Sequence, residues 1–128
     1  MSKGEELVAK ILRENGFQYK REVSIPGMNG FKEPLRFDFV VFKNNKFCFA
    51  LEVDGKQHFS YVPFFHKTKM GFNKAKEMDR RKNSFCLVNK IPLIRIPYWE
   101  LEGLSIKTIF NPAFLVKSKF HNDLIGRN

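Results

Sequence analysis

Three acidic residues interrupt or end apolar segments in the middle of the sequence. Asp38 lies between Phe37 and Phe39, and Glu52 and Asp54 close the next apolar run. A carboxylate inside an apolar strand is costly to desolvate unless it is paired or bound to a cation. Convergent carboxylate oxygens are the ligands that Mg²⁺ prefers, and an ion held in this way polarises a phosphate and activates a bound water. We therefore predict a Mg²⁺ site made by Asp38, Glu52 and Asp54, in which Mn²⁺ substitutes.

The strands that carry these residues are predicted to form a hairpin. Apolar and β-branched residues fill 35–42 and 47–53, and the Asn-Asn pair at 44–45 is typical of a tight turn between two strands. Side chains alternate along a strand, so the two acidic residues that end the second run face the same side. Antiparallel pairing then brings Asp38 close to Glu52. The prediction fails if these two carboxyl groups lie on opposite sides of the sheet.

The other elements follow from the same kinds of pattern. Ser2 and Glu5 have capping-box spacing for a helix that Gly16 ends. A strand is expected over 17–23, a loop at 26–30, a helix that ends near Asn89, a strand over 91–98 and a short helix over 105–110. The order helix, strand, strand, strand, helix, strand predicts an α/β fold in which a mixed four-stranded sheet is flanked by helices.

The 128 residues are expected to form one domain, with a core over about 2–98 and a C-terminal extension over 99–128. Cys48 and Cys86 lie in separate apolar stretches and lack the spacing of a zinc site, so both are expected to be free thiols. The chain shows no charged-then-apolar leader and no apolar run long enough to span a membrane. These features predict a soluble protein in a reducing, cytoplasmic compartment.

A candidate base and a candidate cation follow the acidic strand. His58 comes directly after Gly55, Lys56 and Gln57, and a neutral imidazole near a metal-bound phosphate accepts the proton of an attacking water. Asp79 is a candidate partner for the other ring nitrogen. Lys82 lies three residues beyond Asp79, on the same face of a helix, where an ammonium would stabilise charge on a phosphate.

Taken in order, these motifs resemble a known nuclease family. The segments that carry the likeness are Ser2-Lys3-Gly4-Glu5, Leu35-Arg36-Phe37-Asp38-Phe39, Leu51-Glu52-Val53-Asp54-Gly55-Lys56-Gln57-His58, Asp79 with Lys82, and Leu93-Ile94-Arg95-Ile96-Pro97-Tyr98. Over residues 2–98 they look like small phage and large-virus nucleases of the PD-(D/E)XK (restriction-endonuclease-like) superfamily, near the EDxHD homing endonucleases and the very-short-patch repair endonucleases.

The resemblance implies a restriction-endonuclease-like core and Mg²⁺-dependent hydrolysis of DNA phosphodiesters. It places the family's catalytic residues on Glu5, Asp38, His58 and Asp79, with Glu52 as the second metal-contacting side chain. The chain departs from the family pattern at two points. Asp54 stands where the family has a lysine, so that role is absent or has moved to Lys56 or Lys82, and the zinc ligands of the mismatch-repair enzymes have no counterpart.

The charge balance favours a polyanionic partner. The sequence has 23 Lys and Arg against 13 Asp and Glu, a formal net charge of +10, and cations that replace counterions on a phosphate backbone add binding energy. The candidate DNA-contacting residues are Lys56, Gln57, Lys67, Lys69, Lys74, Lys76, Arg80, Arg81 and Arg95. The aromatic residues of 59–65 are expected either to pack in the core or to stack on bases.

Several alternatives remain open at this stage. Glu5 serves either as the capping partner of Ser2 or as a support for the metal, and a surplus of basic side chains also suits a solvated helix face. A binding protein without activity, and a resolvase or RNA nuclease using the same residues, are the rival functions. High sequence specificity in so short a chain would need a homodimer, a partner DNA-binding protein or recognition of DNA shape.

Overall fold

Four strands form one mixed sheet in the computed structural model, which describes residues 1–30 and 34–125. The strands are β1 (Gln18–Asn29), β2 (Pro34–Lys43), β3 (Lys46–Asp54) and β4 (Leu93–Pro97). The helices are α1 (Lys3–Glu14), α2 (Pro63–His66), α3 (Lys69–Val88), α4 (Ile106–Ile109) and α5 (His121–Ile125), with single 3-10 turns η1 (Lys56–His58), η2 (Tyr98–Glu100) and η3 (Pro112–Phe114). The predicted α/β class and the order of the main elements are confirmed.

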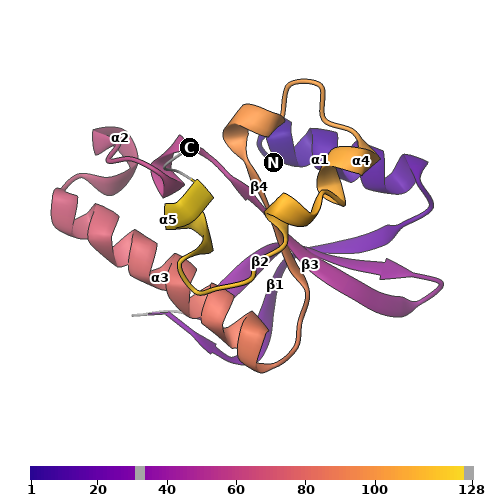
Figure 1. Ribbon diagram of the computed structural model, residues 1–128, viewed down its shortest axis with the longest axis horizontal. Coiled ribbons are helices and arrows are strands. Elements are labelled where there is room, and N and C mark those ends of the chain that lie inside the picture. The colour runs from indigo at the N-terminus through magenta and orange to yellow at the C-terminus, as the bar shows by residue number, and fades with distance from the viewer. Residues whose placement is uncertain (31–33, 126–128) are drawn as a thin grey trace.

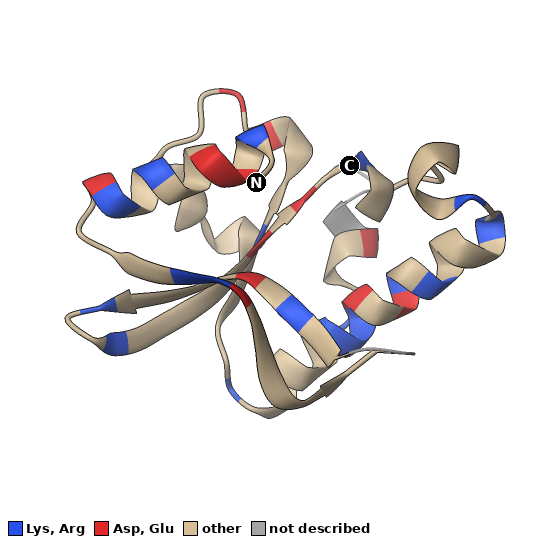
Figure 2. Ribbon diagram, turned by 180° about the vertical axis from the view of Figure 1, so that it is seen from behind, with Lys and Arg blue, Asp and Glu red and all other residues tan. Residues whose placement is uncertain are grey.

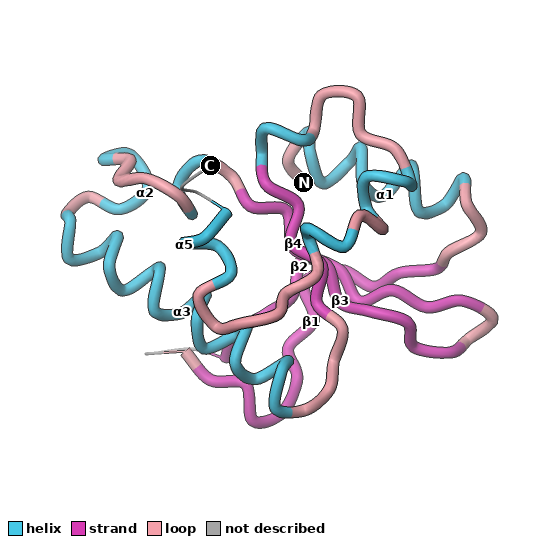
Figure 3. Tube along the Cα trace, in the orientation of Figure 1, coloured by secondary structure: helices cyan, strands magenta, loops and turns pink. Residues whose placement is uncertain are grey.

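The sheet has the order β1-β2-β3-β4, in which β1, β2 and β3 are antiparallel and β3 and β4 are parallel. A parallel pair needs a crossover connection, and α3 provides it by running back between β3 and β4 (Figure 3). Asn44 and Asn45 both have positive φ, 51° and 62°, as the predicted two-residue hairpin turn requires.

Two apolar clusters cover the two faces of the sheet, and α1 and α3 lie on opposite sides of it (Figure 1). Val8 and Leu12 of α1 pack with Phe39 and Leu51, because the apolar residues of α1 fall on one helical face. Cys86 of α3 belongs to the second cluster, where burial raises the pKa of its thiol to about 12. The expectation that Cys48 and Cys86 are free thiols is confirmed.

The chain after β4 covers sheet and helix rather than forming a loose tail. Leu115 makes an antiparallel bridge with Ile94, so this segment protects the free edge of β4, which is buried along its length. Helix α5 packs against α3 (Figure 1). The short helix expected over 105–110 is present as α4, and residues 126–128 of the expected extension lie outside the described residues.

One predicted boundary is wrong. The segment 26–30 was expected to be a loop, but β1 continues to Asn29, which pairs with Pro34 of β2. The register between the two strands shifts between Ser24 and Asn29, and Gly27 takes a φ of 88° there. The glycine thus forms an irregularity within a strand, which in sequence has the same signature as a turn.

Candidate functional site

Asp38 and Glu52 meet across the β2–β3 pair. Phe39 pairs with Leu51, so the register continues to Asp38 opposite Glu52. Each acidic side chain accepts a hydrogen bond from the opposite strand: the Val53 amide donates to Asp38 Oδ2 at 2.8 Å, and the Asp38 amide donates to Glu52 Oε2 at 3.3 Å. The two carboxyl groups therefore lie on the same side of the sheet, as the hairpin prediction requires.

The pair is strongly coupled in the absence of a cation. Burial, the charge of Glu52 and a hydrogen bond with its carboxyl group raise the pKa of Asp38 to about 9. At neutral pH Asp38 therefore keeps its proton, because burial and the neighbouring charge of Glu52 both disfavour a second carboxylate there. A divalent cation relieves the same repulsion, so the donor set fits an ion such as Mg²⁺.

Lys82 reaches this pair from α3. Its ammonium forms an ion pair with Glu52 Oε1 and also donates to the backbone oxygen of Arg36 at 2.6 Å. The Lys82 side chain is 13% exposed and that of Glu52 is 5% exposed, so little water screens the contact. Of the two lysines predicted to assist the chemistry, Lys82 contacts a carboxylate of the site, whereas Lys56 is exposed in η1.

His58 contacts Asp79, as the sequence suggested. The distance from Nδ1 to Asp79 Oδ2 is 2.9 Å, and Asp54 Oδ1 lies 3.5 Å from the same nitrogen. Burial lowers the pKa of His58, but the two carboxylates outweigh it and raise the pKa above its usual value. Because both carboxylates face Nδ1, we assign the proton of the neutral ring to Nδ1, which leaves Nε2 as the acceptor.

Asp54 does not join Asp38 and Glu52. Its carboxylate is 1% exposed and accepts from Arg95 Nε at 2.8 Å, from Arg95 Nη2 at 3.0 Å and from Asn122 Nδ2 at 3.1 Å. With its oxygens used in this way, Asp54 is the ion-pair partner of Arg95, and the prediction that it binds the metal is wrong.

Arg95 lies in the interior of this network. Its side chain is 1% exposed and its other donors reach Asp79 Oδ1 at 3.1 Å and Asn83 Oδ1 at 2.9 Å. Burial raises the pKa of Asp79, but Arg95 and His58 outweigh this and hold it at about 2. The prediction that Arg95 contacts nucleic acid is wrong, because a phosphate cannot reach a guanidinium that the protein encloses.

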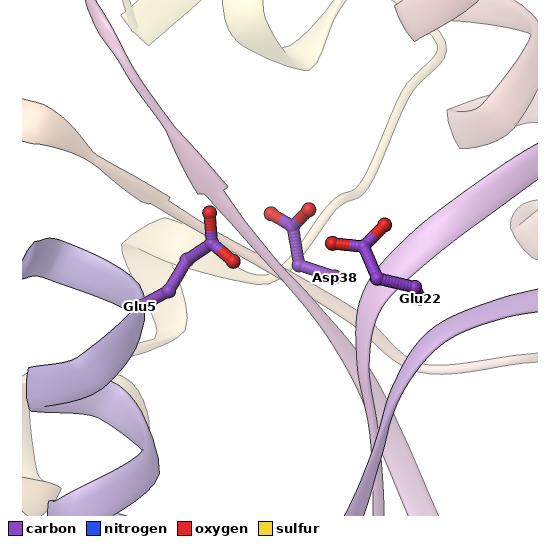
Figure 4. A group of neighbouring side chains, drawn as sticks. All are labelled: Glu5, Glu22 and Asp38. Carbon is purple, nitrogen blue, oxygen red and sulfur yellow. The ribbon is translucent and has the colours of Figure 1, made fainter. Parts of the chain in front are cut away.

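Glu5 has the capping role proposed for it and also lies near Asp38. It completes the capping box, since its amide donates to Ser2 Oγ at 3.2 Å, and its carboxylate also lies in a group with Glu22 and Asp38. One oxygen of each of these three side chains lies within 4.8 Å of the others (Figure 4). Arg21 forms an ion pair with Glu5 inside this group.

Sequence reasoning missed Arg21 and Glu22. The pairs Arg21↔Phe39 and Val23↔Phe37 place Glu22 opposite Asp38, so the signal was the register of the first hairpin. That signal was hidden because the alternation along 17–23 is weak. Glu22 also has a φ of 54°, an unusual conformation for a side chain within a strand.

The predicted basic surface follows α3 and the segment before it (Figure 2). Lys67, Lys69 and Lys74 are exposed, whereas Lys76 and Arg80 form ion pairs with Asp123 of α5 at 2.7 and 2.6 Å. The other predicted contact residues are Gln57, part-buried in η1, and Arg81, exposed on α3 with a contact to Glu77. A cavity of about 190 Å³ is lined by His58 and His66 and by Asp79 and Lys82 of α3.

The aromatic residues of 59–65 divide into two groups. Phe59 packs against Trp99, with 4.8 Å between ring centroids, but Phe64 and Phe65 are 85% and 59% exposed. The expectation of core packing is therefore wrong for Phe64 and Phe65. Of the described helices, none is long and apolar enough to cross a membrane.

Comparisons with known proteins find relatives in viruses. The chain is 31% identical over 111 residues to the uncharacterized protein 307L of Invertebrate iridescent virus 6, covering 76% of the chain and 56% of that protein. It is 35% identical over 49 residues to the uncharacterized protein 033L of Invertebrate iridescent virus 3, covering 38% of the chain and 25% of that protein. It is 36% identical over 63 residues to the uncharacterized protein 094L of Frog virus 3, covering 47% of the chain and 41% of that protein. The chain thus matches about half or less of each relative. No family model matches it, and no solved structure matches it.

Proposed function

We propose that this protein is a Mg²⁺-dependent DNA endonuclease with a restriction-endonuclease-like core. The observation that carries the proposal is the Asp38–Glu52 pair, in which part-buried Asp38 lies opposite buried Glu52 and Glu52 also binds Lys82. Placing a second carboxyl group beside the Glu52–Lys82 ion pair costs desolvation energy and keeps Asp38 from ionising at neutral pH. A pair of this kind is better explained as a binding site whose natural occupant is a divalent cation.

Asp38 and Glu52 hold the cation, and the remaining residues act on the substrate. When bound, Mg²⁺ polarises the phosphate and makes water a better nucleophile at neutral pH. His58 accepts a proton from the attacking water at Nε2, and Asp79 keeps the ring in the required orientation through Nδ1. The water oxygen forms a new bond to phosphorus, one ester P–O bond breaks, and the leaving oxygen takes a proton from solvent.

Lys82 supplies positive charge beside the reacting phosphate. Its ammonium already lies against Glu52, so its position next to the cation is fixed before substrate arrives. A donor held in place in this way stabilises the charge that develops on the phosphate oxygens without further reorganisation. Of Lys56 and Lys82, the two candidates for the family's catalytic lysine, Lys82 therefore takes that role.

DNA is the proposed substrate because exposed basic side chains border the site. Lys67 and Lys74 are exposed and directly adjoin His66 and Ala75 in the sequence, which line the cavity beside His58 and Lys82, and Lys69 is exposed at the start of α3. The relatives found are virus proteins, as the resemblance to large-virus proteins leads one to expect. A chain with these residues but without cleavage, a resolvase and an RNA nuclease are the alternatives that an assay separates.

The test is incubation with supercoiled plasmid in the presence of Mg²⁺, of Mn²⁺, or of EDTA. We expect nicked or linear product with either metal and none with EDTA, and none with Asp38→Ala or Glu52→Ala. Cleavage that persists in EDTA, or in both variants, rejects the mechanism. If the protein binds duplex, branched or single-stranded DNA but cleaves none of them, and does not cleave RNA either, the result supports a binding protein without activity.

The basic surface gives a separate prediction about affinity. We expect the triple Lys→Gln variant of Lys67, Lys69 and Lys74 to weaken DNA binding and to reduce the slope of log K against log salt by about 2 to 3, since each lost phosphate contact removes about 0.9. The matched control replaces Lys20, Lys43 and Lys46, which are exposed on the β1–β3 strands away from α3. Fluorescence anisotropy of labelled duplex across a salt series measures both slopes, and equal slopes contradict the assignment.

A further inference from the structure

Arg21 contacts an acidic group that otherwise resembles a second cation site. Glu5, Glu22 and Asp38 approach one another within 4.8 Å from α1, β1 and β2 (Figure 4). The guanidinium of Arg21 forms an ion pair with Glu5, and its Nη2 lies 3.7 Å from Glu22 Oε1. The positive charge that three neighbouring carboxyl groups require is thus already supplied by the chain itself.

Several contacts fix the position of this guanidinium. Nε donates to the backbone oxygen of Asp38 at 3.1 Å, and the guanidinium carbon lies 4.6 Å from the centroid of the Phe39 ring. Together with the ion pair to Glu5, these contacts hold the planar group from three sides. Arg21 therefore lies beside Asp38, the residue proposed to hold the metal.

One part of Arg21 is not used within the protein. Nη1 makes no hydrogen bond to any of residues 1–30 and 34–125, and the side chain is 21% exposed. An arginine kept only as a structural tie has no need of an unused, accessible donor next to a metal-binding carboxylate. A guanidinium has donors and no acceptor, so Nη1 presents a donor to an anion.

We infer that Arg21 is a further catalytic residue, which donates from Nη1 to a non-bridging oxygen of the phosphodiester held at Asp38 and Glu52. In this arrangement Arg21 does the work of a second cation, so the chain takes one divalent ion. Glu5 is then a positioning residue for Arg21 rather than a metal ligand. The inference rests on the proposed function, because it places the phosphate at the Asp38–Glu52 site.

The test combines metal binding with kinetics. Titration calorimetry with Mn²⁺ should give one ion per wild-type chain. Arg21→Ala should lower kcat about 100-fold or more, as removal of one preorganised donor does, while KM for DNA stays within about threefold. Guanidinium ion at about 20 mM, far below denaturing concentrations, should raise the kcat of Arg21→Ala at least about tenfold. The matched control is Arg13→Ala, which removes an exposed α1 arginine that contacts Tyr19 and should cleave like wild type.

Two results overturn the inference: two Mn²⁺ ions per wild-type chain, or cleavage by Arg21→Ala within about threefold of wild type. If Arg21→Ala does not fold, Arg21→Lys decides, since it keeps the charge but loses the second donor. A tenfold or larger drop in kcat with unchanged Mn²⁺ affinity and melting temperature supports the inference, and a smaller drop overturns it. If the wild type neither binds Mn²⁺ nor cleaves DNA, the proposed function itself has failed.

Discussion

Asp38→Asn is expected to abolish cleavage and yet to stabilise the metal-free protein at alkaline pH. Asparagine has the shape of the aspartate and keeps an oxygen that accepts from the Val53 amide. It cannot supply the negative charge that a divalent cation requires. Loss of the metal removes several kcal/mol of transition-state stabilisation, which corresponds to a drop in rate of about 1000-fold or more.

The effect on stability has the opposite sign. The pKa of Asp38 is raised from 3.8 to about 9 on folding, so the native state binds the proton more tightly than the unfolded chain does. The stability that this proton contributes is fully present below pH 3.8 and is lost progressively as the pH rises toward about 9. Asparagine has no proton to lose, so the variant should not show this decline.

Thermal unfolding in EDTA at a series of pH values from 5 to about 9 measures the difference. The melting temperature of the wild type should fall across this range more steeply than that of Asp38→Asn, and saturating Mn²⁺ should flatten the wild-type curve alone. The control is Asp123→Asn, which removes a carboxylate from α5 that does not contact the pair. Parallel curves for wild type and Asp38→Asn would show that the two carboxyl groups are not coupled as described.

Arg95→Met is expected to give the largest loss of stability of any single substitution discussed. Methionine fits the apolar length of arginine but leaves the carboxylates of Asp54 and Asp79 without their cation. Removing one partner of a buried ion pair costs about 3–5 kcal/mol, a large part of the about 5–15 kcal/mol that holds a typical domain folded. The midpoint of urea unfolding, followed by circular dichroism, should fall accordingly.

Two further variants separate the network from general effects of the substitution. Arg36→Met changes an exposed arginine on β2 and should change stability by less than about 0.5 kcal/mol. Adding Asp54→Asn and Asp79→Asn to Arg95→Met removes the unpaired charges and should recover part of the loss. If Arg95→Met unfolds at the same urea concentration as Arg36→Met, the network does not stabilise the fold.

The hairpin that carries the central pair could be predicted from sequence, because the Asn-Asn turn joins β2 to β3. Its register could not: the pairs next to the turn, Lys43↔Lys46 and Phe42↔Phe47, would set Asp38 opposite Leu51, and the shift between Val41 and Phe42 sets it opposite Glu52. The contact of His58 with Asp79 was expected from the chemistry of a general base and not from periodicity, since the two residues lie 21 positions apart.

The fate of Asp54 could not be predicted in this way. Alternation correctly placed Glu52 and Asp54 on one face, but their partners depend on the parallel β3–β4 pairing, which sets Arg95 opposite Glu52 and within reach of Asp54. Asn122 of the C-terminal segment completes that site from another part of the chain. Long-range pairing of this kind leaves no periodic signal in sequence.

Anomalous scattering from a crystal of the protein grown with Mn²⁺ tests the metal site directly. We expect a peak between the carboxyl groups of Asp38 and Glu52, with oxygens of both at about 2.0–2.3 Å, close to the distances for Mg²⁺. A map with no peak there, or with manganese bound only elsewhere, would contradict the claim that these two side chains hold the metal.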